Sequence, residues 1–260
     1  MVLSTLLLAV SLAAAPAPAP RPRLQDEPIV DDRPELKGLF TTLQGHLSKK
    51  GVEDEQARTI LDKLVQEFPQ SGPKDRAAIV KEVAGCFDVK RPKELQEGVP
   101  DDRIFLSSAV ALGTMGPESV KPLLEQLGGK DHKKNIRLQV EIAHSLGKTK
   151  SPDAVKPLLS LLKHKDSPMQ AAGAESLGNY LEAPLDTRKV IFEELLKTLM
   201  DQMIKKQDIT DTEAMDRWNV ISGPIITTLQ KVSGHNETDP ELWQRWWNDN
   251  KKKEWGPKAE

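Results

Sequence analysis

Five histidines are the side chains best suited to chemistry, and their spacing excludes a local metal motif. They are His46, His132, His144, His164 and His235. No two stand four positions apart, so the pattern that places two zinc ligands on one helix face is missing from the sequence. We expect His132 and His164 to lie in equivalent turns of neighbouring helix pairs, and packed helices are about 8–10 Å apart. Two nitrogens that bind one zinc lie about 3–4 Å apart, so these two histidines should be too far apart to share a metal. We therefore expect solvated turn histidines, with no metal and no cofactor.

The carboxylates and the single cysteine also have structural explanations. Acidic pairs occur at Asp31-Asp32, Asp101-Asp102 and Glu193-Glu194. Adjacent side chains on a helix point about 100° apart, so we expect these pairs to cap helices or face solvent. Cys86 lies in the apolar stripe 83–87, which indicates a small buried residue. The motifs of serine hydrolases, phosphate-binding loops and thiol redox sites are missing too, so we expect no enzymatic activity.

Two clusters of side chains are candidate binding sites. The first is a basic ridge, formed by Lys130, His132, Lys133, Lys134, Lys163, His164 and Lys165, which stacked turns would align along one edge. The ridge would attract anions, although charged turns are ordinary in soluble helical proteins. The second is a Trp cluster, formed by Trp243, Trp246 and Trp247 on one helix face. These indoles could stack on sugars or lie at a membrane interface, but we favour a cap over the end of a helical array.

Helical periodicity runs through almost the whole chain from residue 33 onward. Leucine and phenylalanine between 36 and 47 fall on one helix face, and the stripes 57–68 and 79–87 repeat that pattern after breaks. No segment alternates with period two, so the chain is predicted to be all-α. The first two predicted helix pairs are 33–49 with 52–68 and 73–88 with 101–115, and two repeats follow between 116 and 178. The fifth predicted pair is 185–206 with 211–232, whose second helix is kinked or split at Gly223-Pro224. A final helix is predicted to begin at Pro240.

Internal repetition is the strongest feature of the sequence. The segment Val-Lys-Pro-Leu-Leu occurs at 120–124 and again at 155–159, which is 35 residues later. The pair Leu112-Gly113 recurs as Leu146-Gly147 and Leu177-Gly178, and an alanine stands three positions before each leucine. Each unit is too short to form a domain and has only one apolar face on each helix. Stacking the units side by side would bury those faces.

Each unit is predicted to be two antiparallel helices joined by a polar turn. The first helix follows Gly116-Pro117 or Ser151-Pro152, where the small residue caps and the proline suits the first turn. The second helix is expected to bury Ile136, Val140, Ala143 and Leu146 and to end at Gly147. Ala143 and Ala174 should lie where neighbouring helices approach closely.

These residues resemble the HEAT-repeat family, in particular the short bacterial HEAT-like repeats first noticed in phycobilisome lyases. The matching positions are Asp131 between the helices, Arg137 six positions later, and the closing segment 143–147. Pro122 and Pro157 resemble the kink of that family.

The resemblance extends from about Asp101 to Tyr180, and the second unit departs from it with Ala172 where the family often has arginine. It implies a right-handed α-solenoid, here of about five helix pairs, which acts as a binding scaffold. It implies no specific ligand.

Composition excludes some classes of partner and some classes of fold. The chain has 37 basic and 39 acidic side chains and a net charge of −2, so it lacks the strongly basic domain of a nucleic-acid binder. One cysteine in 260 residues excludes an internal disulfide framework. Aromatic residues make up only 4%, which favours helices over a β-sandwich.

The N-terminus predicts export. Residues 1–19 carry no charge, and 2–15 are nearly all apolar or small, too short for the roughly 20 residues of a membrane span. No basic residue precedes this stretch and prolines follow the possible cleavage sites, so a retained tail is the alternative. Residues 20–32 form a predicted Pro-rich linker, 33–234 a HEAT-like solenoid, and 235–260 a capping helix.

The leading hypothesis is an exported, non-enzymatic scaffold that binds another protein in the periplasm, the cell envelope or outside the cell. We expect a monomer with no integral membrane span and no nucleic-acid partner. One alternative is a lyase-like or enzyme-accessory HEAT protein, which a genuine signal peptide would disfavour because lyase scaffolds are intracellular. Another is a module for envelope polysaccharides that uses the Trp cluster.

The export hypothesis predicts cleavage between Ala13 and Ala19. Mass spectrometry of the protein from its own cells should therefore find no peptide that contains residues 6–12. An intact N-terminus recovered from the cytosol would contradict the hypothesis.

Overall fold

The fold is a stack of helix pairs. The structure is a computed structural model that describes residues 31–92 and 94–255; the predicted signal peptide and nearly all of the predicted linker lie outside them. The α-helices of this part are α1 (Pro34–Leu47), α2 (Asp54–Glu67), α3 (Pro73–Gly85), α4 (Arg103–Thr114), α5 (Val120–Gln126), α6 (Ile136–Lys148), α7 (Pro152–Leu161), α8 (Ser167–Leu177), α9 (Leu185–Lys205), α10 (Thr212–Ser233) and α11 (Pro240–Asn250).

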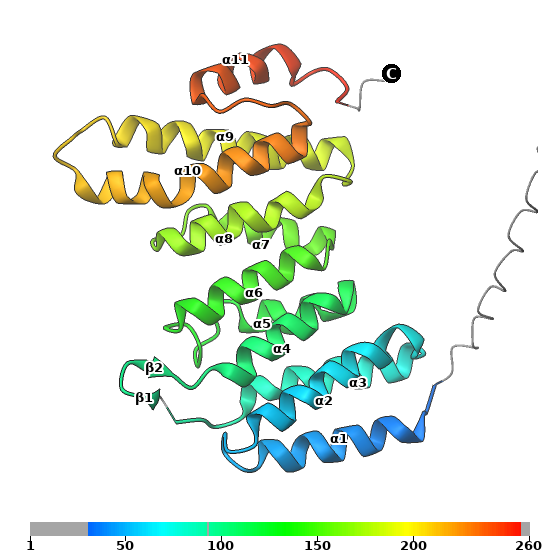
Figure 1. The fold of residues 1–260 in the computed structure, drawn as a ribbon. Coiled ribbons are helices and arrows are strands. Elements are labelled where there is room, and N and C mark those ends of the chain that lie inside the picture. The colour runs from blue at the N-terminus through cyan, green and yellow to red at the C-terminus, as the bar shows by residue number, and fades with distance from the viewer. Residues whose placement is uncertain (1–30, 93, 256–260) are drawn as a thin grey trace, which may run out of the picture.

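The helices form an α-solenoid of five antiparallel pairs followed by α11 (Figure 1). The second helix of each pair packs against the second helix of the next, so α2, α4, α6, α8 and α10 form one continuous layer. The predicted all-α solenoid is therefore confirmed. Among the described residues, every helix is too short or too polar to cross a lipid bilayer.

Three details differ from the sequence-based expectations. A short antiparallel hairpin, β1 (Glu94–Gln96) with β2 (Val99–Pro100), lies between α3 and α4, and it is too short for alternation to be visible in the sequence. The helix α10 continues through Gly223-Pro224 and is not split. A 3₁₀ turn over 116–119 precedes α5, so Pro122 lies in the first turn of that helix, where proline is tolerated and no kink is needed. Pro157, in contrast, lies inside α7.

A buried ion pair holds the segment that carries this hairpin against the first repeat. Arg91 donates Nε to Asp54 Oδ2 at 3.1 Å and Nη2 to Asp54 Oδ1 at 2.7 Å. The two side chains are only 2% and 0% exposed. A bidentate contact of this kind satisfies both charges, which could not otherwise be buried at tolerable cost.

Close contacts at glycine set the distance between successive second helices. A Cβ on Gly147 of α6 would lie 2.7 Å from Cβ of Ser176 on α8, and one on Gly113 of α4 would lie 2.9 Å from Cβ of Ser145 on α6. We predicted that Gly147 ends its helix, and this was wrong. The helix extends to Lys148, and the left-handed residue of the turn is Lys150, with φ of 52°. Gly147 is required because a neighbouring backbone occupies the space of a side chain.

Side-chain hydrogen bonds also join neighbouring second helices at two places, α6 with α8 and α8 with α10. Ser176 donates its hydroxyl to the carbonyl of Ala143 at 2.9 Å, and Thr228 on α10 donates to the carbonyl of Ala174 at 2.8 Å. Ala143 and Ala174 therefore lie at close helix contacts, as the repeat predicts. The equivalent hydroxyl of Ser145 is buried without a partner among the described residues.

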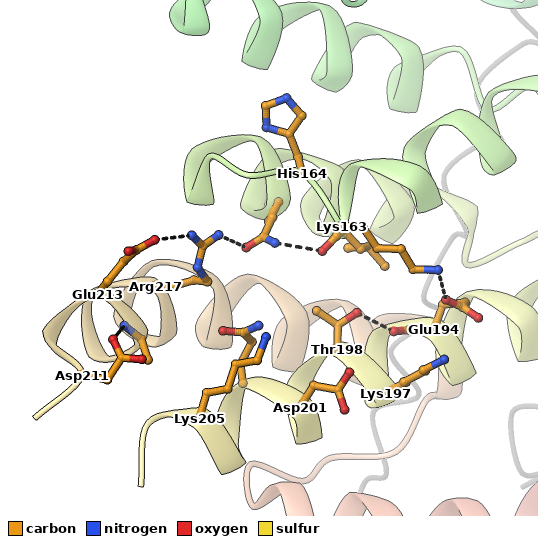
Figure 2. Close-up of a pocket in the computed structure, with 14 residues that line it drawn as sticks. Lys163, His164, Glu194, Lys197, Thr198, Asp201, Lys205, Asp211, Glu213 and Arg217 are labelled. Carbon is orange, nitrogen blue, oxygen red and sulfur yellow. Dashed lines mark hydrogen bonds and ion pairs between the residues drawn. The ribbon is translucent and has the colours of Figure 1, made fainter. Parts of the chain in front are cut away.

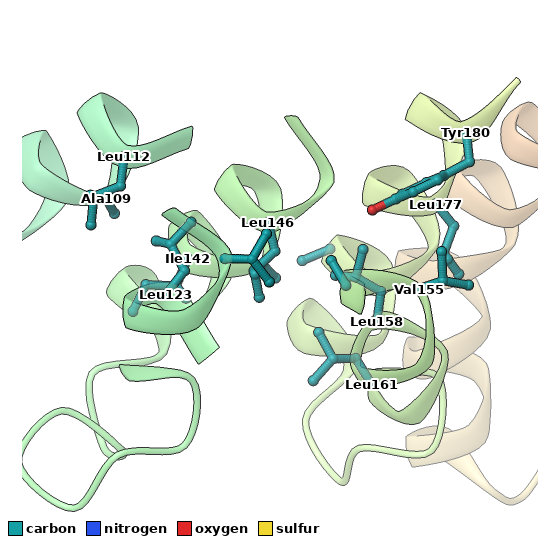
Figure 3. Packing of buried hydrophobic residues seen from close by; sticks show 14 of the residues in the cluster. Ala109, Leu112, Leu123, Ile142, Leu146, Val155, Leu158, Leu161, Leu177 and Tyr180 are labelled. Carbon is teal, nitrogen blue, oxygen red and sulfur yellow. The ribbon is translucent and has the colours of Figure 1, made fainter. Parts of the chain in front are cut away.

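The core is continuous between the repeats (Figure 3). Leu123, Ile142 and Leu146 pack at one interface, and Leu158, Leu161 and Leu177 continue the core into the next repeat. The predicted stripe of α6 needs one correction. Ile136 and Val140 are only half-buried, because they lie on the outer side of α6, whereas Leu138 and Ile142 enter the core.

The close-contact glycines generate the first structural prediction. Gly147→Ala should destabilise the fold by about 1–3 kcal/mol, because its Cβ would overlap the backbone of α8. The matched control is Gly38→Ala in the exposed part of α1, where nothing lies within 4 Å of the new Cβ. That variant should gain about 0.5–1 kcal/mol from helix propensity. Thermal unfolding measures both, and equal effects of one sign would contradict the contact.

Candidate functional site

The first candidate site is an open groove across α2, α4 and α6, with a volume of about 890 Å³. Its floor is aliphatic and includes Leu106, Val110 and Val140. Val110, in the second half of α4, is 40% exposed. The groove thus combines an uncovered apolar floor with a position on three successive repeats, both of which are features of interaction surfaces.

Arginines border one end of this groove, and neighbouring carboxylates hold them in place. Arg58 contacts Glu55 at 2.9 and 3.0 Å on α2. At the start of α4, Arg103 lies 3.5 Å from Asp101. At the start of α6, Arg137 lies 3.4 Å from Asp102. Of the two roles expected for the pair 101–102, facing solvent was wrong, because both carboxylates are buried, and Asp102 stands at the N-cap position of α4 without a side-chain capping bond. Asn135, one repeat further on, also donates to Asp102 at 3.1 Å.

The second candidate site is the α9 cleft, which lies between the turn joining α7 to α8 and the helices α8, α9 and α10 (Figure 2). Its volume is about 550 Å³. The lining residues are Leu162, Lys163, His164, Gln170, Glu194, Lys197, Thr198, Asp201, Gln202, Lys205, Asp211, Glu213, Ala214 and Arg217. The cleft is therefore strongly polar, unlike the groove.

Ion pairs fix two walls of the α9 cleft. Lys163 lies 3.6 Å from Glu194, and Arg217 lies 3.0 Å from Glu213 (Figure 2). Arg217 also donates to the carbonyl of Lys165 at 2.9 Å, so it ties α10 to the turn before α8. These pairs give the walls both signs of charge.

Two buried glutamines in the α9 cleft have different surroundings. Gln170 is 5% exposed; it donates to the carbonyl of Leu162 at 3.0 Å and accepts from Arg217 at 3.2 Å. Gln202 is 6% exposed, and its Oε1 atom has no hydrogen-bond partner among the described residues. An acceptor that is buried without any partner costs about 1–3 kcal/mol.

The structure separates the residues of the predicted basic ridge. Lys130, Lys133 and Lys134 are exposed in the turn between α5 and α6, whereas Lys163 and His164 line the α9 cleft. Lys165 is exposed beside them. The candidates therefore occupy successive turns, where Lys163 lies 3.6 Å from Glu194 and His164 lies 3.7 Å from Asp166; anion binding by the ridge stays a prediction.

His132 differs most from its prediction as a solvated residue. Its Nε2 atom lies 3.0 Å from the carbonyl oxygen of Phe87, and its ring centroid lies 4.6 Å from that of Phe105. The ring therefore links the turn before α6 to the preceding repeat. This contact joins residues that are distant in sequence, which is why spacing alone did not indicate it.

The Trp cluster packs around one phenylalanine of α9. Phe192 lies 5.5 Å from Trp243 and 5.1 Å from Trp247, measured between ring centroids. Trp243 is 0% exposed, and Trp247 is also buried. Trp246 is half-buried and stacks on His235 at 5.1 Å with nearly parallel planes. Among these three indoles, only Trp246 retains a surface on which a sugar could stack.

Neither Cys86 nor Tyr180 is activated as a nucleophile, and the described residues form no cluster of metal ligands. Cys86 is buried, and desolvation raises the pKa of its thiol to about 11, so the thiol is neutral near pH 7. Desolvation also raises the pKa of Tyr180 to about 12, while its hydroxyl donates to the carbonyl of Ser151 at 2.9 Å. Among the described residues, no three His, Cys, Asp or Glu side chains are grouped closely enough to hold a metal ion.

The class of protein defined by this architecture is a helical-repeat solenoid with open surfaces on its second helices and turns. Residues 93–178 match a family model described as HEAT repeats, so the chain carries HEAT repeats in this segment. The model does not distinguish the phycobilisome-lyase type, which stays a prediction. Searches of curated proteins and of solved structures found no match.

Sequence reasoning did not identify the floor of the groove or Gln202 as functional candidates. The groove had one visible signal: Leu106 and Val140 are separated by 34 residues, the repeat period, and each stands three positions before a repeated alanine. Gln202 had none, because a glutamine at a helix position is ordinary until its surroundings are known.

The packing of the Trp cluster predicts that it stabilises the fold. Trp243→Ala should cost about 3–5 kcal/mol, because it removes a fully buried indole. The matched variant Trp246→Ala should cost clearly less, since that side chain is half-buried. Thermal unfolding followed by circular dichroism tests both. If Trp243→Ala unfolds at the wild-type temperature, α11 does not stabilise the solenoid, and the cluster becomes the prime candidate for polysaccharide binding.

Proposed function

We propose that this protein is an exported, non-enzymatic scaffold that binds a segment of another protein in the groove across α2, α4 and α6. The observation that carries the proposal is the exposed aliphatic floor around Val110, which spans three repeats of a rigid solenoid. HEAT repeats are typical of protein interaction, and this supports the coarser part of the proposal.

The arrangement of the groove suits a partner segment with apolar anchors. Side chains that fill the groove would remove Val110 and Val140 from water, which supplies about 25 cal/mol for each Å² of apolar surface buried. The arginines at one end already have carboxylate partners, so they would orient a partner at the rim while the apolar floor supplies most of the affinity.

Export is the second element of the proposal. It rests on the uncharged apolar segment 2–15 and the small residues that follow it. The partner would then be a protein of the periplasm, the envelope or the medium.

Site-specific photocrosslinking tests the groove. A photoreactive phenylalanine in place of Val110 should give a discrete protein adduct in the producing cells. The same replacement at Val190, an exposed residue of α9 outside the groove, is the control and should give none. In the same cells, Val140→Glu should remove the Val110 adduct, and its melting temperature should fall only slightly because Val140 is half-buried on the outer side of α6. Equal adducts at both positions, or an adduct that survives Val140→Glu, would contradict the proposal.

A further inference from the structure

We propose that the partner segment bound in the groove is an amphipathic α-helix, which lies with its C-terminal end against Arg58, Arg103 and Arg137. The inference rests on the proposed function of the groove and adds the conformation and the direction of the bound segment. Two properties of the groove support it: the aliphatic floor, and the change in the sign of charge along its length.

The floor of the groove suits a helix better than an extended segment. The helices that form the floor use their own backbone groups internally, and the hairpin of β1 and β2 contributes no residue to the lining. An extended segment would therefore lie with most of its N–H and C=O groups unpaired against aliphatic side chains, which is costly. A helix pairs its own backbone groups and presents apolar side chains from one face. The aliphatic lining residues are Val65, Leu106, Val110, Ala111, Ile136 and Val140.

Other classes of ligand fit the groove poorly. Among the described residues that line it there is no phenylalanine, tyrosine or tryptophan, so a sugar ring or a nucleobase would find none of their faces to stack on. A fatty acid would match an arginine and an aliphatic floor. Small-molecule sites bury most of their ligand, however, and this groove is open along its length.

The sign of charge changes along the groove. The helices α2, α4 and α6 run in the same direction (Figure 1), and the three arginines lie in their first or second turns. One helical turn beyond Arg58 and Arg137, the lining carries Asp62 and Glu141; Lys148, outside the lining, lies 3.8 Å from Glu141. A helix has a partial negative charge at its C-terminus and a partial positive charge at its N-terminus. The groove therefore favours a helix that runs antiparallel to α4 and α6, with its C-terminal end at the arginines.

The arginines retain donors for that end of the partner helix. Among the described residues, Arg58 donates only through Nη1, to Glu55, and Arg137 only through Nη1, to Asp102. A guanidinium has five N–H donors, so each side chain keeps others for a ligand. The last four C=O groups of a helix have no partner within it. These carbonyls, or a carboxylate that follows them, can accept from Arg58 and Arg137.

Paired photocrosslinks measure the conformation and the direction of the bound segment. A photoreactive phenylalanine replaces Ser107 or Thr114 of the full chain in the producing cells; both residues line the groove, about 10 Å apart along α4. Mass spectrometry then locates the partner residue in each adduct. A helical segment should be labelled at positions about five to seven residues apart, whereas an extended segment covers that distance in about three. The residue joined to position 107 should lie on the C-terminal side of the residue joined to position 114.

Charge-reversal variants test the direction independently. Arg58→Glu should lower the yield of the adduct at position 107 about threefold to tenfold, because it replaces an attractive charge by a repulsive one at an exposed contact. The matched control is Lys63→Glu, at an exposed residue of α2 outside the groove, which changes the net charge equally and should leave the yield unchanged. Equal yields in the two variants would overturn the assignment of the C-terminal end to the arginines.

Thermal unfolding of each variant separates binding from folding. Ser107 is half-buried, and its replacement by a large side chain can lower the melting temperature. In that case Glu55 and Asp62 of α2 form the second pair, because both are exposed, both line the groove, and they have the same spacing. The expected separation and order of the labelled partner residues are unchanged, with position 55 at the arginine end.

The remaining outcomes also decide the question. Labelled residues about three apart, labelled residues in the reverse order, or adducts with a lipid would overturn the helix assignment, as would an adduct at Val110 with none at either pair. Each of these results leaves the groove in place as a binding site, because the Val110 adduct tests the groove alone. Loss of the Val110 adduct itself rejects the proposed function, and the helix with it.

Discussion

The close approach of one second helix to the next is the constraint on which the rest of the structure depends. At Gly113 and Gly147 the space of a side chain is occupied by the serine of the following helix, and Ser176 also bonds across to the carbonyl of Ala143. Gly178 meets Thr228 of α10 in a similar way, with a distance of 3.2 Å from a Cβ to the hydroxyl oxygen. Helices held this closely cannot slide or rotate without overlap, so the contacts fix the registration of the layer from α4 to α10.

Both candidate surfaces follow from this registration. The second helices α4 and α6 each use one side for the glycine contact and another for the core, and the remaining side chains must face outward. On α4 and α6 these are aliphatic, which gives the groove its floor around Val110 and Val140. The α9 cleft arises because α9 and α10 are longer than the helices before them, with Arg217 bridging back to the turn before α8. The fold thus positions an apolar and a polar surface on one rigid body.

Much of the fold could be predicted because its determinants are local. Helical periodicity and caps placed most helices within a few residues, including α11, which begins at Pro240 as expected. The errors concern contacts between repeats. His132 was expected in solvent and Asp102 at a helix cap or in solvent, but their partners lie in another repeat. The role of Gly147 depends on a helix that follows about 30 residues later. The α9 cleft was not predicted for the same reason. The unpaired acceptor of Gln202 can be recognised only when the positions of α8, α10 and the turn before α8 are known.

The glycine contact also determines how such a chain can change in length. The helix α6 carries both halves of the contact, since Ser145 fits the preceding glycine and Gly147 receives the following serine. A duplicated copy of this unit, inserted between its neighbours, would therefore meet a complementary surface on each side. The array can lengthen by whole units without redesign of any interface, and each added unit would move the α9 cleft further from the groove. Gene duplication would then set the distance between the two candidate sites.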